Sequence, residues 1–310
     1  MNRRNFVKTG MASALVGGTT NNIFGNIKPE KPLKNNFNLK YAPHFGMFEN
    51  NAGKDLLSQL HFMSDNGFTA LEDNGMMGRS IEEQEKISKE MQKLNMTMGV
   101  FVLDGGDNWK VSLTTGKQEF KDLFLKTCKT AAEVAKRVNA KWMTVVPGYF
   151  ERNLSMGYQT SNIIEAMRRA SDIFEPLGLI MVLEPLSDNP DLFLRFSDQS
   201  FAVCQAVKSP SCKFLFDLYH MQRNEGNLIK NLEKSWNEVA YIQIGDNPGR
   251  NEPGTGEINY KNIFKFIYEK GYKGVMGMEH GISKPGKEGE MALIKAYMDA
   301  DDFLKVNNKK

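Results

Sequence analysis

Four side chains with oxygen donor atoms each follow an apolar run in the second half of the chain. They are Glu184 in "IMVLEPL", Asp217 in "FLFDLYH", Gln243 in "YIQIGD" and Glu279 in "GVMGMEHG". Their separations are 33, 26 and 36 residues, each about one strand plus one helix. A single carboxylate at a strand end is often only a solvated terminus. Four in successive units indicate side chains that meet at one end of neighbouring strands.

The chemistry of such a group points to a metal ion. Three carboxylates brought together cannot all stay ionised without a compensating cation, because each raises the pKa of the others. The two Glu, one Asp and one Gln supply oxygen donors, with no thiolate and no imidazole. This donor set favours Mg²⁺ or Mn²⁺ over Zn²⁺. We therefore expect a divalent metal site at Glu184, Asp217, Gln243 and Glu279.

A metal at this place suggests proton transfer on a hydroxy-carbonyl compound. Binding two neighbouring substrate oxygens would polarise the carbonyl and stabilise an enediolate. Glu184 and Glu279, which would also be metal ligands, are expected to remove and return the proton from opposite sides. His220 lies three residues after Asp217 and is expected to donate a hydrogen bond to a substrate oxygen. The alternative for His220 is a residue that caps or supports the site.

The elements that would position these residues recur at a steady pace from residue 39 onward. Eight apolar runs, read as strands, alternate with eight amphipathic segments, read as helices. The expected strands lie in 39–46, 68–73, 96–104, 141–148, 179–186, 213–220, 239–247 and 272–281. The expected helices lie near 53–66, 80–95, 118–138, 160–178, 198–208, 226–237, 260–270 and 289–306.

This alternation predicts an α/β fold of the (β/α)₈ barrel class in a single domain. Strands that are apolar on both faces and separated by helices are typical of a parallel sheet, and eight units suffice to close it. An open, doubly wound sheet is the alternative. The longer loops follow strands and not helices, which in a barrel places them at the face where active sites lie.

Several strings in the second half resemble the hydroxypyruvate isomerase family, within the xylose isomerase-like barrels. They are "LEPL", "FDLYHMQ", "YIQIGDNPGRNEPGTGEINY" and "GMEHG". The resemblance implies the same metal site, with the two glutamates as acid and base. Many related 3-epimerases carry His where this chain has Gln243, so Gln243 favours the hydroxypyruvate isomerase branch. Arg250 and Glu257 match family positions at the barrel mouth, where both are expected to bind substrate; for Glu257 a loop anchor is the alternative.

The predicted function is that of a metal-dependent isomerase acting on a small hydroxy-carbonyl substrate of the hydroxypyruvate or tartronate semialdehyde type. A keto-sugar epimerase or a dehydratase could use the same scaffold and the same enolate chemistry. A barrel that binds sugar without turnover is the alternative from another class. The loops after the first two strands, "GMFENNAGKD" and "LEDNGMMGRS", depart from the family pattern, and these loops shape the choice of substrate.

The N-terminal segment reads as an export signal followed by a linker. Arg3, Arg4, Phe6, Val7 and Lys8 match the twin-arginine pattern, and a short run of small apolar residues follows. We therefore expect an exported, periplasmic protein, with signal and linker over 1–38 and the catalytic domain over 39–310. The apolar run is too short for a stable membrane span.

The composition favours a small molecule, and not nucleic acid, as the binding partner. A net charge of +3 is spread along 310 residues, which leaves no basic patch for nucleic acid. Cys128, Cys204 and Cys212 have no metal-binding spacing and are expected to be core thiols, with a Cys204–Cys212 bridge as the alternative. The sequence leaves open whether the chain forms a homo-oligomer.

Overall fold

The structure, a computed structural model, describes residues 36–304. Short parallel strands form the inner wall of this part of the chain. Seven of them form one sheet in the order β1-β9-β8-β7-β6-β5-β4, and β2 pairs with β3 in a second. All pairs are parallel. The strands are β1 Lys40–Ala42, β2 Ala70–Leu71, β3 Thr97–Met98, β4 Phe101–Val102, β5 Trp142–Val145, β6 Ile180–Leu183, β7 Cys212–Asp217, β8 Val239–Gln243 and β9 Val275–Gly277.

The two sheets together close a barrel. β3 and β4 together occupy one of the eight strand positions of the barrel, since β3 pairs with β2 and β4 pairs with β5. The remaining join is made between the ends of β1 and β2, where the N–H of Glu72 donates to the carbonyl oxygen of Pro43 at 3.0 Å. The eight predicted strand positions are thus all present, and the closed (β/α)₈ barrel is confirmed in place of the open sheet.

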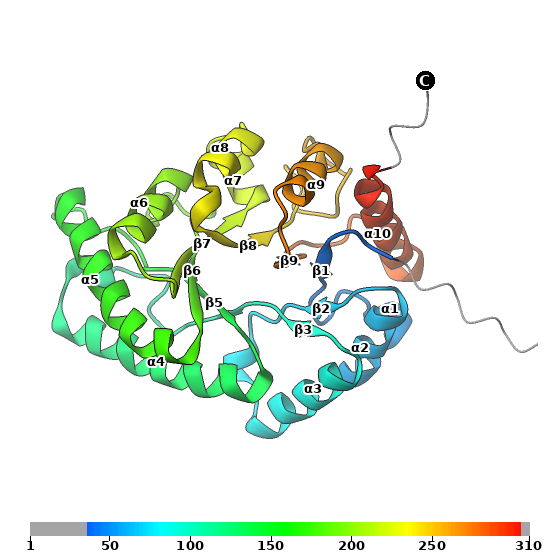
Figure 1. Cartoon of the computed structure of the whole chain (residues 1–310), viewed down its shortest axis with the longest axis horizontal. Helices are drawn as coiled ribbons and strands as arrows, with labels where there is room; N and C mark the ends of the chain where they lie inside the picture. The colour runs from blue at the N-terminus through cyan, green and yellow to red at the C-terminus, as the bar shows by residue number, and fades with distance from the viewer. Residues whose placement is uncertain (1–35, 305–310) are drawn as a thin grey trace, which may run out of the picture. The chain divides into compact units, whose positions relative to one another are not determined.

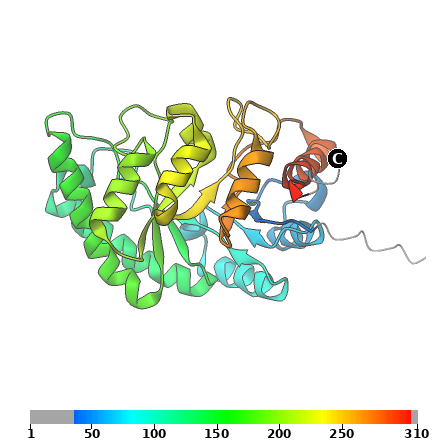
Figure 2. The same ribbon diagram turned by 45° about the horizontal axis from the view of Figure 1, so that its top comes forward.

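Helices surround this wall, as Figures 1 and 2 show. The segment 118–138 was predicted to be helical and is α4 (Gln118–Val138), whose apolar face includes the buried Ala131 and Ala135. The other helices are α1 Glu49–Ala52, α2 Leu56–Asp65, α3 Ile81–Lys93, α5 Met156–Phe174, α6 Ser197–Val207, α7 Leu218–Asn224, α8 Leu228–Ser235, α9 Tyr260–Glu269 and α10 Gly286–Asp301.

The sequence reading missed two short helices that follow strands. The segment 213–220 was assigned wholly to a strand, but the chain turns into α7 directly after Asp217, whose side chain caps the new helix. α1 begins before the predicted 53–66 helix and is separated from α2 by Gly53, at φ +81°. Both departures have local causes, a cap and a left-handed residue, that apolar periodicity does not reveal.

Small and large residues share the narrow interior of the barrel. Tyr241 of β8 lies there among Ala42, Ala70 and other apolar residues from neighbouring strands, and it is fully buried. Gly99, between β3 and β4, has no side chain where a Cβ would collide with the Tyr241 hydroxyl. The missing side chain at Gly99 therefore makes room for the aromatic ring of Tyr241, whose hydroxyl points toward the end of β2.

The cysteines lie in the core, as predicted, and Cys204 and Cys212 do not form a bridge. Cys128, Cys204 and Cys212 are all buried and all free. Among residues 36–304, no helix combines the length and apolar character needed to cross a bilayer. The expected export signal falls on residues 1–35, outside the described part of the chain, apart from the last three residues of its linker.

Candidate active site

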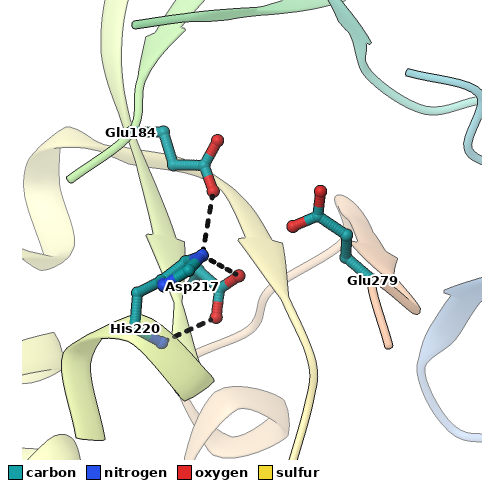
Figure 3. Close-up of side chains that lie close together, drawn as sticks. All are labelled: Glu184, Asp217, His220 and Glu279. Atoms are coloured by element: carbon teal, nitrogen blue, oxygen red, sulfur yellow. Dashed lines mark hydrogen bonds and ion pairs between the residues drawn. The ribbon is translucent and has the colours of Figure 1, made fainter. Parts of the chain in front are cut away.

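Three of the four predicted ligands meet at the carboxyl ends of the strands, together with His220. Ligand atoms of Glu184, Asp217, His220 and Glu279 lie within 4.8 Å of one another. Glu184 directly follows β6, Asp217 ends β7, and Glu279 lies two residues beyond β9. In Figure 3 the carboxylates of Glu184 and Glu279 approach the same space from opposite sides. We call these four residues the acidic cluster.

The short helix α7 orients Asp217. Its Oδ1 accepts hydrogen bonds from the backbone N–H groups of Tyr219 at 2.7 Å and His220 at 3.1 Å. Its Oδ2 is thereby turned into the acidic cluster, 3.7 Å from Nε2 of His220. The side chain is fully buried. The helix missed in the sequence is thus what fixes one oxygen of Asp217 and leaves the other for a ligand.

The hydrogen bonds of His220 decide which of its nitrogens faces the cluster as a donor. The backbone N–H of Ser187 donates to Nδ1 at 3.2 Å, and the Ser187 hydroxyl lies 2.8 Å from the same atom. Burial lowers the pKa of His220, which favours the neutral ring. Because Nδ1 accepts, the single proton lies on Nε2, 4.0 Å from Oε1 of Glu184. An N–H group cannot ligate a metal, so His220 suits a hydrogen-bond donor to substrate.

Gln243 lies at the end of β8, and its amide is oriented by a residue that the sequence reading did not single out. Its Nε2 donates to Oε1 of Glu72 at 2.9 Å, and the Tyr241 hydroxyl donates to Oε2 of Glu72 at 2.8 Å. Because Glu72 takes the amide nitrogen, Oε1 of Gln243 points elsewhere; it is buried and has no partner. Gly277 makes room for this arrangement, since a Cβ there would collide with the Glu72 carboxylate.

A signal for Glu72 was present in the sequence. The residue ends the apolar run "FTALED", as Glu184 and Glu279 end theirs. Its strand, β2, lies on the far side of the barrel from β6 and β7. The regular spacing that links Glu184, Asp217, Gln243 and Glu279 concerns only the second half of the chain, so it does not include Glu72. Only the closure of the barrel brings Glu72 beneath Gln243.

The electrostatics of the site favour binding a cation. Burial, and then the charge of Glu279, hold the pKa values of Glu72 and Glu184 well above their usual range. Burial also raises the pKa of Glu279 to about 7, against the opposing charge of Arg250. Oε1 of Glu184, like Oε1 of Gln243, is buried without a partner. Two unpartnered oxygens beside a group of carboxylates fit the hard donor set of a divalent metal.

Arg250 reaches the acidic cluster from the loop after β8. Its Nη2 donates to Oε2 of Glu279 at 2.7 Å and lies 3.5 Å from Oδ2 of Asp217. The same nitrogen lies 3.1 Å from Nε2 of His220, and the guanidinium stacks 5.0 Å above the ring of Tyr219. With the His220 proton on Nε2, both nitrogens are donors. A substrate oxygen beside this pair could accept from both.

Glu257 does not reach the acidic cluster, and its expected contact with substrate stays a prediction. Its side chain is exposed and accepts hydrogen bonds from Asn247 and Gln222 on the outer side of the loop. The buried Asp246 holds the backbone on both sides of Glu257, because its carboxylate accepts hydrogen bonds from the N–H groups of Gly254, Gly256 and Ile258. The hydrogen bonds of Glu257 fit the alternative, a loop anchor.

Comparison with known proteins agrees with this architecture. The model of the family described as xylose isomerase-like TIM barrel matches residues 60–298. Hydroxypyruvate isomerase of Escherichia coli is 30% identical over 179 residues, which cover 57% of this chain and 67% of that protein. The 2-oxo-tetronate isomerase of Cupriavidus necator is 28% identical over 177 residues, 56% of this chain and 68% of that protein. Both relatives support an isomerase on this scaffold.

Solved structures share the fold. The structure described as an AP endonuclease, family 2, from Brucella melitensis superimposes with a TM-score of 0.70 at 24% identity, covering 81% of this chain and 96% of that one. At this identity the likeness concerns the fold alone. With a family model that spans most of the chain and a barrel that closes as that family requires, the chain belongs to the xylose isomerase-like TIM barrel family.

Proposed function

We propose that the protein is a metal-dependent isomerase that moves a proton between the carbonyl and hydroxyl carbons of a small hydroxy-oxo acid, of the hydroxypyruvate or tartronate semialdehyde type. The observation that carries this proposal is the opposed pair Glu184 and Glu279, within reach of the same small space. The names of the relatives from Escherichia coli and Cupriavidus necator support the choice of reaction and of substrate class.

Four residues would hold the metal: Glu184, Asp217, Gln243 and Glu279. Gln243 has its amide nitrogen tied to Glu72 and its Oε1 buried without a partner. Asp217 has Oδ1 tied to backbone N–H groups, while Oδ2 faces the acidic cluster, 3.5 Å from Nη2 of Arg250. The set of oxygen donors favours Mg²⁺ or Mn²⁺. When bound, such an ion would polarise the substrate carbonyl and lower the cost of the enediolate.

The protein's own groups would carry the proton. One glutamate would remove a proton from the hydroxyl-bearing carbon, and the other would deliver its own proton to the neighbouring carbonyl carbon from the opposite side. The hydroxyl proton would pass to the former carbonyl oxygen, and exchange with water would then reset both glutamates. Burial raises the pKa values of both glutamates, and a bound cation would oppose this shift and favour the ionised form that acts as the base. His220 and Arg250 would donate hydrogen bonds to the oxygen on which negative charge develops.

Proton exchange in deuterated water tests the function. Hydroxypyruvate, tartronate semialdehyde and a panel of keto-sugars would be incubated with the protein and Mg²⁺ or Mn²⁺, and with EDTA as the metal-free control. We expect deuterium at the carbon next to the carbonyl of an acid substrate, and none in EDTA. Loss of one water mass from the product would instead identify a dehydratase. A change of configuration in a keto-sugar would identify an epimerase, and no exchange with any compound would leave a binding barrel.

Replacing Glu72 by Met should weaken metal binding by roughly 10- to 100-fold, because Gln243 loses the acceptor that orients its amide. Glu72→Gln still offers a carbonyl oxygen to Gln243 and should restore most of the affinity. Tyr241→Phe removes the other hydrogen bond to Glu72, leaves the one from Gln243, and serves as the control. Titration with Mn²⁺ followed by electron spin resonance measures all three. Wild-type affinity in Glu72→Met would show that Gln243 needs no such support.

We also propose that the chain is exported through a twin-arginine signal, on the strength of the Arg3–Lys8 pattern. Replacing Arg3 and Arg4 by Lys should keep the protein in the cytoplasm, as measured by cell fractionation. A periplasmic fraction equal to that of the unchanged chain would refute this proposal without bearing on the activity.

A further inference from the structure

A cavity of about 300 Å³ opens beside Glu279, on the side of the barrel formed by β1 and β2. Glu279 belongs to its lining, so the cavity adjoins the acidic cluster, and Arg79 and Asn74 from the loop after β2 also line it. The volume is at the lower end of the range for small-molecule sites, which suits a compound of few carbon atoms. A larger cavity of about 600 Å³, beneath the loop after β8, has none of the acidic cluster in its lining.

Arg79 is held in the cavity wall with part of its guanidinium unused. Its Nε donates to Oδ2 of Asp73 at 2.5 Å, and the guanidinium lies 5.0 Å above the ring of Phe45. The side chain is 21% exposed. Within residues 36–304, neither terminal nitrogen, Nη1 or Nη2, has a hydrogen-bond partner. Arg79 therefore offers two adjacent N–H donors on a rigid plane, the arrangement that matches a carboxylate.

Asn74 lines the same cavity and contacts one member of the proposed acid–base pair. Its Nδ2 donates to Oε1 of Glu279 at 2.8 Å. Its Oδ1 is buried and has no partner, so it can accept from a substrate hydroxyl. The cavity thus has a carboxylate suited to proton transfer at one side, an unpartnered acceptor, and a guanidinium with free donors.

The charge of the cavity makes this guanidinium important for an acidic substrate. Glu72, Asp73 and Glu279 all line the cavity, and each of them that is ionised would repel an anion. A neutral keto-sugar meets no such repulsion and needs no cation outside the metal site. A substrate that carries a carboxylate needs a positively charged partner, and Arg79 is the cationic side chain in this lining.

We propose that Arg79 binds the carboxylate of the substrate and so selects hydroxy-oxo acids over neutral hydroxy-ketones of the same length. This rests on the proposed function for the position of the reacting carbons. It adds to that function a carboxylate-binding subsite at Arg79 and a reason for the enzyme to prefer acidic substrates. Asp73 and Phe45 position Arg79, and the unpartnered Oδ1 of Asn74 accepts a hydrogen bond from a substrate hydroxyl.

Calorimetry with D-glycerate tests the subsite without turnover. D-Glycerate carries a carboxylate and two hydroxyls but no carbonyl, and it would be titrated into the Mg²⁺-loaded protein. Arg79→Met should weaken D-glycerate binding at least tenfold while leaving the affinity for Mg²⁺ unchanged. The matched control is Arg152→Met, because Arg152 also pairs with an aspartate, Asp191 at 2.8 Å, and stacks on Phe150 at 5.9 Å, but is 74% exposed and outside this cavity. The control should bind D-glycerate as the wild type does.

Kinetics supply the selectivity. In Arg79→Met the KM for hydroxypyruvate should rise at least tenfold, while proton exchange with dihydroxyacetone, a neutral hydroxy-ketone, should stay within twofold of wild type. Arg79→Lys keeps the charge but loses the paired donors, so its D-glycerate affinity should fall between those of wild type and Arg79→Met. Should Arg79→Met fail to fold, wild-type affinity in Arg79→Lys overturns the proposal.

Two further results would overturn the subsite. One is failure of the wild-type protein to bind D-glycerate, or unchanged binding in Arg79→Met. The other is an equal loss of exchange with the anionic and the neutral compound, which would make Arg79 a structural residue. If the wild type exchanges no proton with any compound, the proposed function fails, and D-glycerate binding still decides the role of Arg79.

Discussion

Replacing Glu279 by Gln should abolish incorporation of solvent deuterium into the substrate, and so should replacing Glu184 by Gln. Each substitution removes a group that takes up or releases a proton and keeps nearly the same shape. A positioned acid or base contributes about 10²- to 10⁴-fold to rate, so exchange should fall by about that factor in either variant. Nuclear magnetic resonance of the substrate in deuterated water measures the rate directly.

The controls separate loss of the proton carrier from loss of the metal. Glutamine still offers a carbonyl oxygen, so Mn²⁺ should continue to bind both variants, though more weakly. Glu165→Gln serves as the matched control, because Glu165 is on α5 and pairs with Lys121 and Arg169 away from the cluster. It should exchange at the wild-type rate. Undiminished exchange in Glu184→Gln or Glu279→Gln would rule that residue out as acid or base.

Replacing Asp246 by Asn should both destabilise the protein and disable the site. Asp246 is fully buried, and its carboxylate accepts from the backbone N–H groups of Gly254 at 2.9 Å, Gly256 at 2.9 Å and Ile258 at 3.0 Å. An asparagine has one acceptor oxygen, and its NH₂ group would face an N–H donor. A buried donor left without a partner costs about 1–3 kcal/mol, so the free energy of unfolding should fall by about that amount.

The same substitution should reduce activity because Asp246 shapes the loop that carries Arg250. The backbone N–H of Arg250 donates to the carbonyl oxygen of Asp246 at 2.7 Å, and Arg250 itself is in the left-handed region at φ +50°. A relaxed loop would let the guanidinium leave Glu279, and kcat/KM should fall by about 10²-fold. Urea unfolding and the exchange assay measure the two effects.

Asp299→Asn is the control for the loop. Asp299 is an exposed residue of α10 that pairs with Lys295, and surface pairs of this kind contribute little to stability. Its substitution should change neither stability nor exchange appreciably. If Asp246→Asn unfolds at the same urea concentration as wild type and keeps its activity, the loop does not depend on this carboxylate.

The outline of the fold follows from the sequence because its signals are local. Apolar runs such as 179–186 and 239–247 place the strands, and the amphipathic stretch 118–138 places a helix. Right-handed crossovers between parallel strands then leave few ways to arrange eight such units. The convergence of Glu184, Asp217 and Glu279 follows from the same regularity, since parallel strands present their carboxyl ends at one face.

What the sequence by itself determined, then, is the barrel and the acids at its mouth. The tertiary structure decided how those acids are supported: Glu72 lies beneath Gln243 only because β2 joins β1 to close the ring. It also decided that Glu257 faces outward. These outcomes depend on hydrogen bonds between residues far apart in the chain, and on loops whose paths are set by buried groups such as Asp246. Periodicity describes which face of an element is buried, but it does not describe which distant atom a side chain meets there.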